Sequence, residues 1–328
     1  MIGRFAAIPL AMTLCLLSAT AIEAGQPPRV ARIGILILES GSAETQTIKG
    51  LKEELRDLGY IEGQNLAVEL RDVKGDRSAL KAAASDLVNK KMDVIFTTGT
   101  RATQAAMVAT KKIPIVFRHI ADPVALGFLK NLRQPEGNVT GVAAFAAETG
   151  QKRLEILQTL VPNLRRVHIF YDENNKYSET NFLAAQKAAA KLKLEVADHP
   201  VKTANELKSV LEQMQARDGD AILQIPDDLV ESQGTFLLDQ AKRLKQATVF
   251  DAESWIAKGS LATYGPNYTQ MGRQAAQIID MLLKGAQPKD APVQSASKFD
   301  LLINLRTANA IGLSIAPEAL NKADRIIR

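Results

Sequence analysis

The chain has 328 residues, of which 46% are hydrophobic, 23% charged and 5% aromatic, and its formal net charge is +5. This length allows two domains with well-filled cores, and basic residues alternate with acidic ones instead of clustering, so we expect a globular protein without a nucleic-acid surface. A single cysteine and three histidines without metal-ligand spacing exclude a disulfide framework and a cysteine-rich metal site, and we expect no cofactor.

The first 24 residues have the pattern of a secretory signal peptide. A positively charged start that includes Arg4 precedes an apolar run over residues 5–17, and small residues follow up to Ala24. The run is shorter than the roughly 20 residues of a membrane span, so we expect an exported mature protein that does not cross a membrane. Cleavage after Ala21 or Ala24 would remove Cys15, and removal of residues 1–24 would leave the net charge at +5 because it takes away both Arg4 and Glu23.

The first half of the remaining sequence alternates strand-like apolar runs with helical periodicity. The predicted strands cover residues 30–38, 66–70, 94–97, 113–117 and 138–142. The predicted helices cover residues 48–58, 80–88, 102–110 and 125–132. The near-continuous aliphatic run at 30–38 is typical of a central parallel strand that is buried on both faces.

The second half repeats this pattern of elements without repeating the residues themselves. Strands are expected at 167–171, 194–197, 221–225, 248–251 and 261–264. Helices are expected at 152–160, 179–192, 204–216 and 232–245. Parallel strands need long crossovers, and helices must cover both faces of such a sheet. The sequence therefore predicts an α/β protein with two similar, doubly wound parallel-sheet lobes.

Two lobes of this kind are expected to share a cleft. We assign residues 29–144 and about 267–290 to the first lobe, and residues 145–266 and about 291–328 to the second. The sequence does not decide to which lobe the helix at 270–283 and the strand at 299–305 belong. Because the chain can cross between the lobes again at these segments, we expect a hinge of several strands and not a single linker. Because ligands in open α/β sheets bind beyond the carboxyl ends of the strands, loops should form the site.

The first-lobe strand ends carry residues suited to holding a ligand. Hydroxyl and backbone N–H groups near helix starts, which favour anions such as carboxylates, are offered by Ser40, Ser42, Thr98, Gly99 and Thr100. The same hydroxyl groups are equally suited to capping helices. Further along the chain, His119 and Asp122 follow the fourth strand, and His119 either faces the cleft or packs beneath it.

The second-lobe strand ends carry acidic, amide and aromatic side chains. These candidates are Tyr171, Asp172, Asn174, Asp227, Glu253, Trp255 and Tyr264. The aromatic members either pack on the apolar body of a ligand or fill the core. No phosphate-binding loop, dinucleotide-binding turn or nucleophile elbow follows a predicted strand, so an enzyme is the function class with the weakest support.

Several motifs in the same order resemble the ABC transporter substrate-binding protein family that includes tryptophan and tyrosine binders. They are Gly50-Leu51, the segments at 58–65, 122–127, 137–142 and 284–288, and Phe299-Asp300-Leu301 with Asn304-Leu305. The resemblance covers nearly all of the mature chain. It implies a type I periplasmic-binding fold, a monomer in the periplasm, and closure of the hinge around a small molecule. The partners that it implies are a membrane permease and its cytoplasmic ATPase.

The resemblance also bears on the ligand. Amino-acid-binding relatives carry an Asp-Asn pair after a second-lobe strand, where this chain has Asp227-Asp228, so Asp227 is expected to bind an ammonium group. The loop at 172–178 departs from the proline and Asn-Ser pair of aromatic amino-acid binders. The expected ligand is therefore an aromatic or other amino acid, or an aromatic acid. The alternative function is a secreted module that presents its ligand to a membrane sensor.

Overall fold

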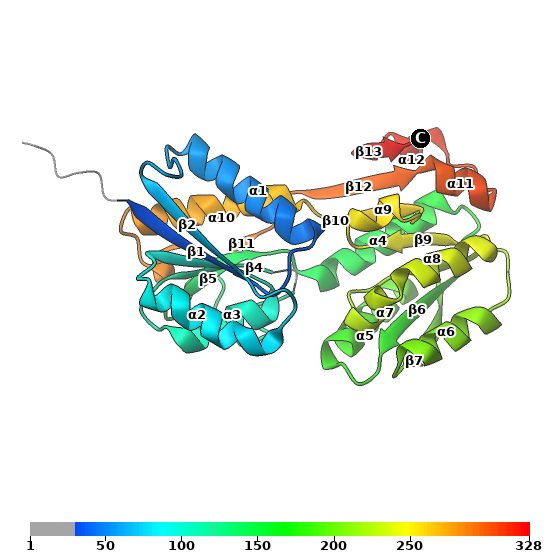
Figure 1. The fold of residues 1–328 in the computed structure, drawn as a ribbon. Helices are drawn as coiled ribbons and strands as arrows, with labels where there is room; N and C mark the ends of the chain where they lie inside the picture. Colours follow the sequence, from blue (N-terminus) through cyan, green and yellow to red (C-terminus); the bar gives the residue numbers. More distant parts are fainter. Residues whose placement is uncertain (1–29, 120) are drawn as a thin grey trace, which may run out of the picture.

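The computed structural model describes residues 30–119 and 121–328, and the predicted signal peptide lies outside these residues. The described chain forms two α/β lobes that lie side by side, each built around its own sheet (Figure 1). The predicted fold class is confirmed. None of the helices in the described part combines the length and the apolar character needed to cross a bilayer.

The first sheet has six parallel strands in the order β11-β5-β4-β3-β1-β2. Their bounds are β1 Ala31–Ile37, β2 Leu66–Asp72, β3 Val94–Thr98, β4 Ile115–His119, β5 Val139–Ala143 and β11 Gln294–Ser295. The helices are α1 Ser42–Asp57, α2 Leu80–Asn89, α3 Gly99–Ala109 and α10 Tyr268–Leu283, with 3-10 turns at Arg77–Ala79 and Pro288–Asp290. Figure 1 shows α1 and α10 on one face of the sheet and α2 and α3 on the other.

The aliphatic run of β1 explains this layering. Ile33, Ile35 and Ile37 belong to the core under α1 and α10, whereas Leu36 packs with α2 and α3. Successive side chains of a strand point to opposite faces, so a strand covered on both sides needs apolar residues at every position.

Two sequence predictions in this lobe need correction. The strand expected at 113–117 runs from Ile115 to His119. The short helix expected at 125–132 is a series of turns, because Gly127 adopts φ of +73°, a left-handed conformation that ends helical geometry. The apolar spacing there instead buries Phe128 and Leu129 beneath the turns.

The second sheet has seven strands in the order β13-β12-β10-β9-β8-β6-β7, and only β12 runs antiparallel to its neighbour β10 among the described pairs. Its strands are β6 Arg166–Asp172, β7 Glu195–Val201, β8 Asp220–Leu223, β9 Ala247–Phe250, β10 Ala262–Pro266, β12 Phe299–Asn304 and β13 Arg325–Ile327. Its helices are α4 Ala146–Leu160, α5 Lys176–Lys191, α6 Ala204–Gln213, α7 Asp228–Ser232, α8 Gly234–Arg243, α9 Ser254–Ala257, α11 Leu305–Ile311 and α12 Pro317–Leu320.

Three connections join the two sheets in the described chain: β5 to α4, β10 to α10, and β11 to β12. Two of them are hydrogen-bonded to each other, because Pro266 pairs with Phe299 and the Asn267 N–H donates to the Lys298 carbonyl at 2.9 Å. The chain passes to the second sheet after Ser295, a few residues beyond the expected change near 291.

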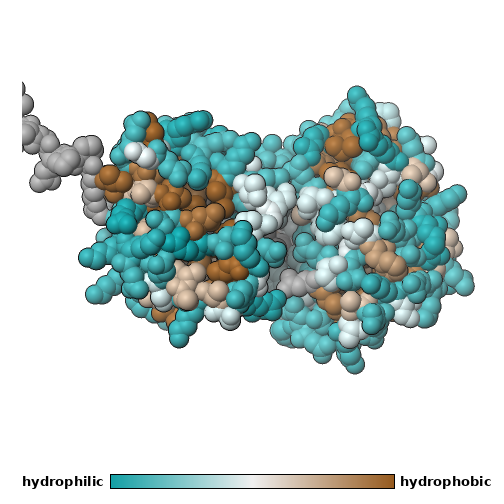
Figure 2. Space-filling view, in the orientation of Figure 1, coloured by the Kyte–Doolittle hydropathy of each residue, from teal (hydrophilic) through white to brown (hydrophobic). Residues whose placement is uncertain are grey.

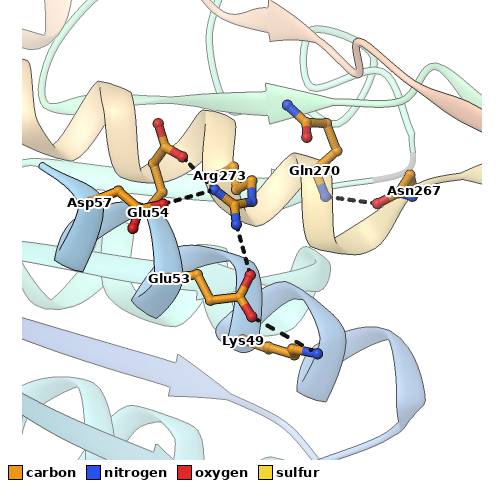
Figure 3. Close-up of polar contacts among 7 residues, drawn as sticks. All are labelled: Lys49, Glu53, Glu54, Asp57, Asn267, Gln270 and Arg273. Carbon is orange, nitrogen blue, oxygen red and sulfur yellow. Dashed lines mark hydrogen bonds and ion pairs between the residues drawn. The ribbon is translucent and has the colours of Figure 1, made fainter.

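Helix α10 packs closely against α1, although more than 200 residues separate them in the chain (|i−j| 220 for Arg273 and Glu53). Arg273 on α10 forms ion pairs with Glu53 and Glu54 on α1, each at 2.9 Å, and with Asp57 at 3.3 Å (Figure 3). The Asn267 side chain caps the start of α10 by accepting from the Gln270 N–H at 2.8 Å. The returning helix thus completes the first lobe.

Candidate functional site

A cavity of about 530 Å³ is lined by residues of both lobes, and Figure 2 shows the surface hollowed between them. Its first-lobe wall is formed by Leu38, Glu44, Arg77, Thr98, Gly99, Thr100, Arg101, Ala102, Gln104, Arg118, His119, Ala121 and Leu126. Its second-lobe wall is formed by Asn175, Tyr177, Pro226, Asp227, Glu231 and Asp251. Among these described lining residues, all the arginines belong to the first lobe and three of the four carboxylates belong to the second.

The turn from β3 into α3 forms one part of the first-lobe wall. Gly99 begins α3 with φ of +77°, a backbone conformation that favours glycine. The Thr98 side chain, which is buried, makes no cap hydrogen bond to the helix. The first-turn N–H groups of a helix lack intrahelical acceptors and carry the positive end of its dipole. This part of the wall is therefore suited to an anionic group.

His119, at the end of β4, is buried against this turn. Its Nε2 lies 2.7 Å from the Thr100 Oγ1, and its Nδ1 accepts a hydrogen bond from the Ala121 N–H at 2.8 Å. Burial, reinforced by the positive charge of Arg118, lowers the pKa of His119 to about 4. The ring is therefore neutral near pH 7.

Arg118 brings a positive charge into the same wall from a buried position. Its guanidinium donates to the Glu44 carboxylate at 2.8 Å and lies over the ring of Tyr268, 4.9 Å from the ring centre. Its Nε has no hydrogen-bond partner within the described residues. Tyr268 begins α10 directly after the crossing from the second lobe, so Arg118 packs beside one of the connections.

Asp227 joins two strand ends in the second-lobe wall. Its Oδ1 accepts from the Val230 N–H at 2.8 Å, which caps α7, and its Oδ2 accepts from the Asp172 N–H at 2.7 Å. These bonds hold the carboxylate in a buried position at the cavity, and a carboxylate retains further lone pairs for another donor.

Asp251 supplies a second carboxylate, directly after β9. Burial raises the pKa of this carboxyl group, and the charge of Arg153 opposes that rise. Arg153 on α4 is itself buried, and its Nε and Nη1 have no hydrogen-bond partner among the described residues. The second-lobe wall thus combines acidic groups that favour a cationic partner. In the described part of the chain, no three histidine, cysteine or acidic residues are grouped to hold a metal ion.

Comparison with known proteins identifies this architecture. The family model for ABC transporter substrate binding proteins matches residues 32–327. The chain belongs to this family. The substrate-binding protein is 28% identical over 282 residues to the tyrosine-binding protein of Clostridioides difficile, covering 86% of this chain and 81% of the relative.

Two solved structures show the same fold at 26% sequence identity, and each covers 91% of this chain. One is the ABC domain from Streptococcus pneumoniae in complex with L-Trp, with a TM-score of 0.79 and all of that chain covered. The other is the ligand-free, open structure of a substrate-binding protein with adhesive properties from Clostridium difficile, with a TM-score of 0.78 and 99% of that chain covered. The predicted family resemblance is therefore confirmed.

Five of the residues singled out in the sequence line the cavity of the substrate-binding protein, namely Thr98, Gly99, Thr100, His119 and Asp227. They share one property, because each follows or ends a parallel strand near the point where the two lobes meet. Their role in ligand binding remains a prediction.

The polar candidates Ser40, Ser42, Asp122 and Asn174 lie outside the cavity and are exposed to solvent. Ser40 donates to Asp72 at 2.6 Å, and Asp122 accepts from the Val124 N–H at 2.8 Å in its own turn. Asp172 lies behind Asp227 and accepts from the Asn174 N–H at 2.9 Å. The side chains of Ser40, Asp122 and Asp172 thus make hydrogen bonds near the strand ends and do not line the cavity.

The aromatic candidates also lie outside the cavity. Tyr171 is buried in the core, where it stacks on Phe182 with ring centres 4.4 Å apart, and Trp255 packs on Phe250 at 5.0 Å. Tyr264 borders a separate cavity of about 350 Å³ in the second lobe. Glu253, beside Trp255 in the chain, forms an ion pair with Arg325. Of the two alternatives for the aromatic residues, Tyr171 and Trp255 therefore fill the core.

The charged lining residues that sequence reasoning missed are Glu44, Arg77, Arg101, Arg118, Glu231 and Asp251. The position of Asp251 at the end of the strand predicted at 248–251 was a signal that could have identified it. Arg118 lies just beyond the strand predicted at 113–117, whereas the observed β4 continues through Arg118 to His119.

Proposed function

We propose that this substrate-binding protein captures a free amino acid in the cavity between its lobes and delivers it to an ABC permease driven by a cytoplasmic ATPase. The observation that carries the proposal is the distribution of charge across the cavity. Thr98, Thr100 and Arg118 offer donors on the first-lobe wall, and Asp227 and Asp251 offer carboxylates on the second. A zwitterion matches both walls.

The proposed orientation places the ligand carboxylate at the start of α3 and its ammonium group at Asp227 and Asp251. Charge-assisted hydrogen bonds of this kind are the strong ones in proteins, especially in a partly desolvated cleft. Because the two ends of the ligand contact different lobes, the closed arrangement gains contacts that an open one lacks. That difference in affinity shifts the population toward closure.

The relatives support the same ligand class. One relative is named a tyrosine-binding protein, and a solved relative contains L-Trp. A volume of about 530 Å³ also falls in the range of roughly 300–1,000 Å³ that is typical of small-molecule pockets. Among amino acids, L-tyrosine and L-tryptophan are therefore the first ligands to test.

A thermal-shift screen tests the zwitterion requirement. L-Tyrosine and L-tryptophan are compared with the other L-amino acids, with tyramine, which lacks the carboxylate, and with 4-hydroxyphenylacetate, which lacks the ammonium group. A ligand that binds only the folded protein raises its Tm. We expect a rise with an intact amino acid and little or none with the two truncated compounds. Equal shifts with a truncated compound, or no shift with any amino acid, would contradict the proposal.

Export and transport are proposed together, because the N-terminal pattern over residues 1–24 predicts a signal peptide. Cell fractionation should place the processed protein in the periplasm. Uptake of the radiolabelled amino acid identified in the screen should fall when the gene is deleted and return when it is restored. Uptake unchanged by the deletion would favour the alternative, in which the liganded protein signals through a membrane sensor.

A further inference from the structure

Both ring nitrogens of His119 are engaged in hydrogen bonds of opposite character. The Ala121 N–H donates to Nδ1 at 2.8 Å, and Nε2 lies 2.7 Å from the Thr100 hydroxyl oxygen. The ring is 5% exposed, and its edge contacts Phe128 with ring centres 5.9 Å apart and an interplanar angle of 82°. Packing and hydrogen bonds together hold it in one orientation.

These contacts decide where the proton of the ring lies. A backbone N–H can only donate, so Nδ1 must present its lone pair to Ala121. In a neutral imidazole the other nitrogen then carries the hydrogen, and Nε2–H donates to the Thr100 oxygen. The ring stays neutral near pH 7 because burial and the neighbouring Arg118 lower its pKa to about 4.

The direction of this bond determines what Thr100 can do. Its oxygen accepts from His119, so its own hydrogen points away from the ring. Among the residues that the structure describes, no group accepts a hydrogen bond from this hydroxyl. Thr100 lines the cavity, next to the first-turn N–H groups of α3, which have no acceptor within the helix and receive no cap from the Thr98 side chain. Its hydrogen is therefore available to a ligand.

We infer that His119 is a positioning residue that fixes the Thr100 hydroxyl as a hydrogen-bond donor and so makes this end of the cavity select a carboxylate. The inference rests on the proposed function and adds a residue that determines specificity for one end of the ligand. A carboxylate oxygen accepts from Thr100 and from the helix N–H groups together. A carboxamide has an NH₂ group in place of one carboxylate oxygen. That NH₂ group can only donate, so it cannot form a hydrogen bond with Thr100 or with a helix N–H group, which are donors too.

The tautomer of His119 is measured first, on the ligand-free protein. Long-range ¹H–¹⁵N correlation spectra at pH 7 distinguish a protonated ring nitrogen from an unprotonated one, and the H119N variant assigns the signals. We expect Nε2 to be protonated and Nδ1 not. A ring protonated at Nδ1, or one that averages between both tautomers, would overturn the inference without reference to any ligand.

Binding is then measured by calorimetry with L-tyrosine and L-tyrosinamide as probes. The variants H119N and H119Q separate the two bonds of His119: the asparagine oxygen can still accept from Ala121, whereas the glutamine amide can still donate to Thr100. We expect H119N to weaken L-tyrosine binding about tenfold and to reduce the preference for tyrosine over its amide. H119Q should retain more of that preference than H119N.

The T100V variant completes the test, because the H119N/T100V double variant should bind L-tyrosine no more weakly than T100V alone. H199N serves as a control, since His199 lies on β7 and does not line the cavity. Additive losses in the double variant, or an unchanged preference in H119N, would overturn the inference. If the wild-type protein binds neither probe, L-tyrosine is excluded as the ligand, and the tautomer measurement still decides whether His119 fixes the Thr100 hydroxyl as a donor.

Discussion

Gly50 of α1 lies directly against the backbone of Thr269 in α10: a Cβ atom on Gly50 would come within 2.0 Å of the Thr269 carbonyl oxygen. The same relationship recurs one turn away, where a Cβ on Gly272 would lie 2.0 Å from the Thr47 carbonyl oxygen. The two helices pack backbone to backbone at these points. The contact holds the returning α10 in the first lobe, directly after the hinge crossing.

We predict that Gly50→Ala and Gly272→Ala each destabilise the ligand-free protein. The helices must separate to admit the methyl group, and overpacking of this kind costs about 1–3 kcal/mol. The higher helix propensity of alanine returns up to about 1 kcal/mol. Chemical denaturation should therefore show a net loss of roughly 1–2 kcal/mol.

Gly150→Ala is the matched control, because Gly150 lies in α4 and a Cβ there would have nothing within 4 Å. This variant should be neutral or slightly more stable than the wild type, as expected from helix propensity alone. If Gly50→Ala behaved in the same way as Gly150→Ala, the close helix packing would not contribute to stability.

Arg273→Ala should destabilise the protein less than Gly272→Ala, although Arg273 has three acidic partners (Figure 3). Its side chain is 30% exposed, and water and salt screen exposed ion pairs, so these pairs contribute little to stability. The loss should shrink further when denaturation is repeated in about 1 M salt, where the screening length is only about 3 Å. A loss above that of Gly272→Ala at both salt concentrations would contradict this ranking.

Acidification below neutral pH should destabilise the protein. The pKa values of His119 and His199 are each lowered from 6.5 to about 4, chiefly by burial, and that of His168 is also lowered. Between pH 6.5 and about 4, the unfolded chain therefore binds more protons than the folded one, so the stability present above pH 6.5 is lost as the pH falls. For the well-buried His119 the shift corresponds to about 3 kcal/mol.

Urea denaturation at pH 7.5, 6.5, 5.5 and 4.5 measures this dependence. The midpoint should change little above pH 6.5 and fall steadily below it, and the slope should be shallower in H119N. Carboxyl groups with a lowered pKa, such as Asp72, whose pKa falls from 3.8 to about 2, lose their contribution only below this window. Asp198 and Asp251, whose pKa values burial raises, act in the opposite direction, so a fall in the midpoint is attributable to the histidines. A midpoint that is constant down to pH 4.5 would show that the histidines are not held neutral by the fold.

The central strands of both sheets were predictable because burial on two faces leaves a continuous aliphatic signal, as in β1, whereas the short edge strands β11 and β13 carry no such signal and were not predicted. Thr98, Gly99 and Thr100 were predictable for a related reason: the carboxyl ends of parallel strands meet at one edge, so position in the chain decides position in the cleft. Asp227 was located from the family resemblance and also follows a strand.

Other features depend on contacts that a linear reading does not contain. Arg118 is held in the cavity wall by Glu44, which is 74 residues away in the sequence. Because this partner is distant in the chain, the sequence around Arg118 did not indicate that its charged side chain is buried. Trp255 follows a strand as expected, but the short α9 turns its ring onto Phe250 and away from the cavity. Orientation of this kind is set by packing in three dimensions.

Asp227 should affect both ligand affinity and stability, because it caps α7, holds the Asp172 N–H and faces the cavity. Asp227→Ala removes a helix cap, which costs about 1–2 kcal/mol of stability. It also removes the proposed partner of the ligand ammonium group, and a hydrogen bond to a charged group contributes about 1.5–3 kcal/mol. We therefore predict a loss of about tenfold to a hundredfold in the affinity for L-tyrosine, measured by calorimetry below the variant's Tm.

Thr203→Ala separates the two effects. Thr203 caps α6 by accepting from the Glu206 N–H at 3.2 Å, and it does not line the cavity. This variant should lose a comparable amount of stability and bind L-tyrosine as the wild type does. Asp227→Asn provides the complementary case, because its amide oxygen keeps one of the two backbone bonds while the charge is removed. If Asp227→Asn bound L-tyrosine with wild-type affinity, the carboxylate would be a structural cap and not the partner of the ammonium group.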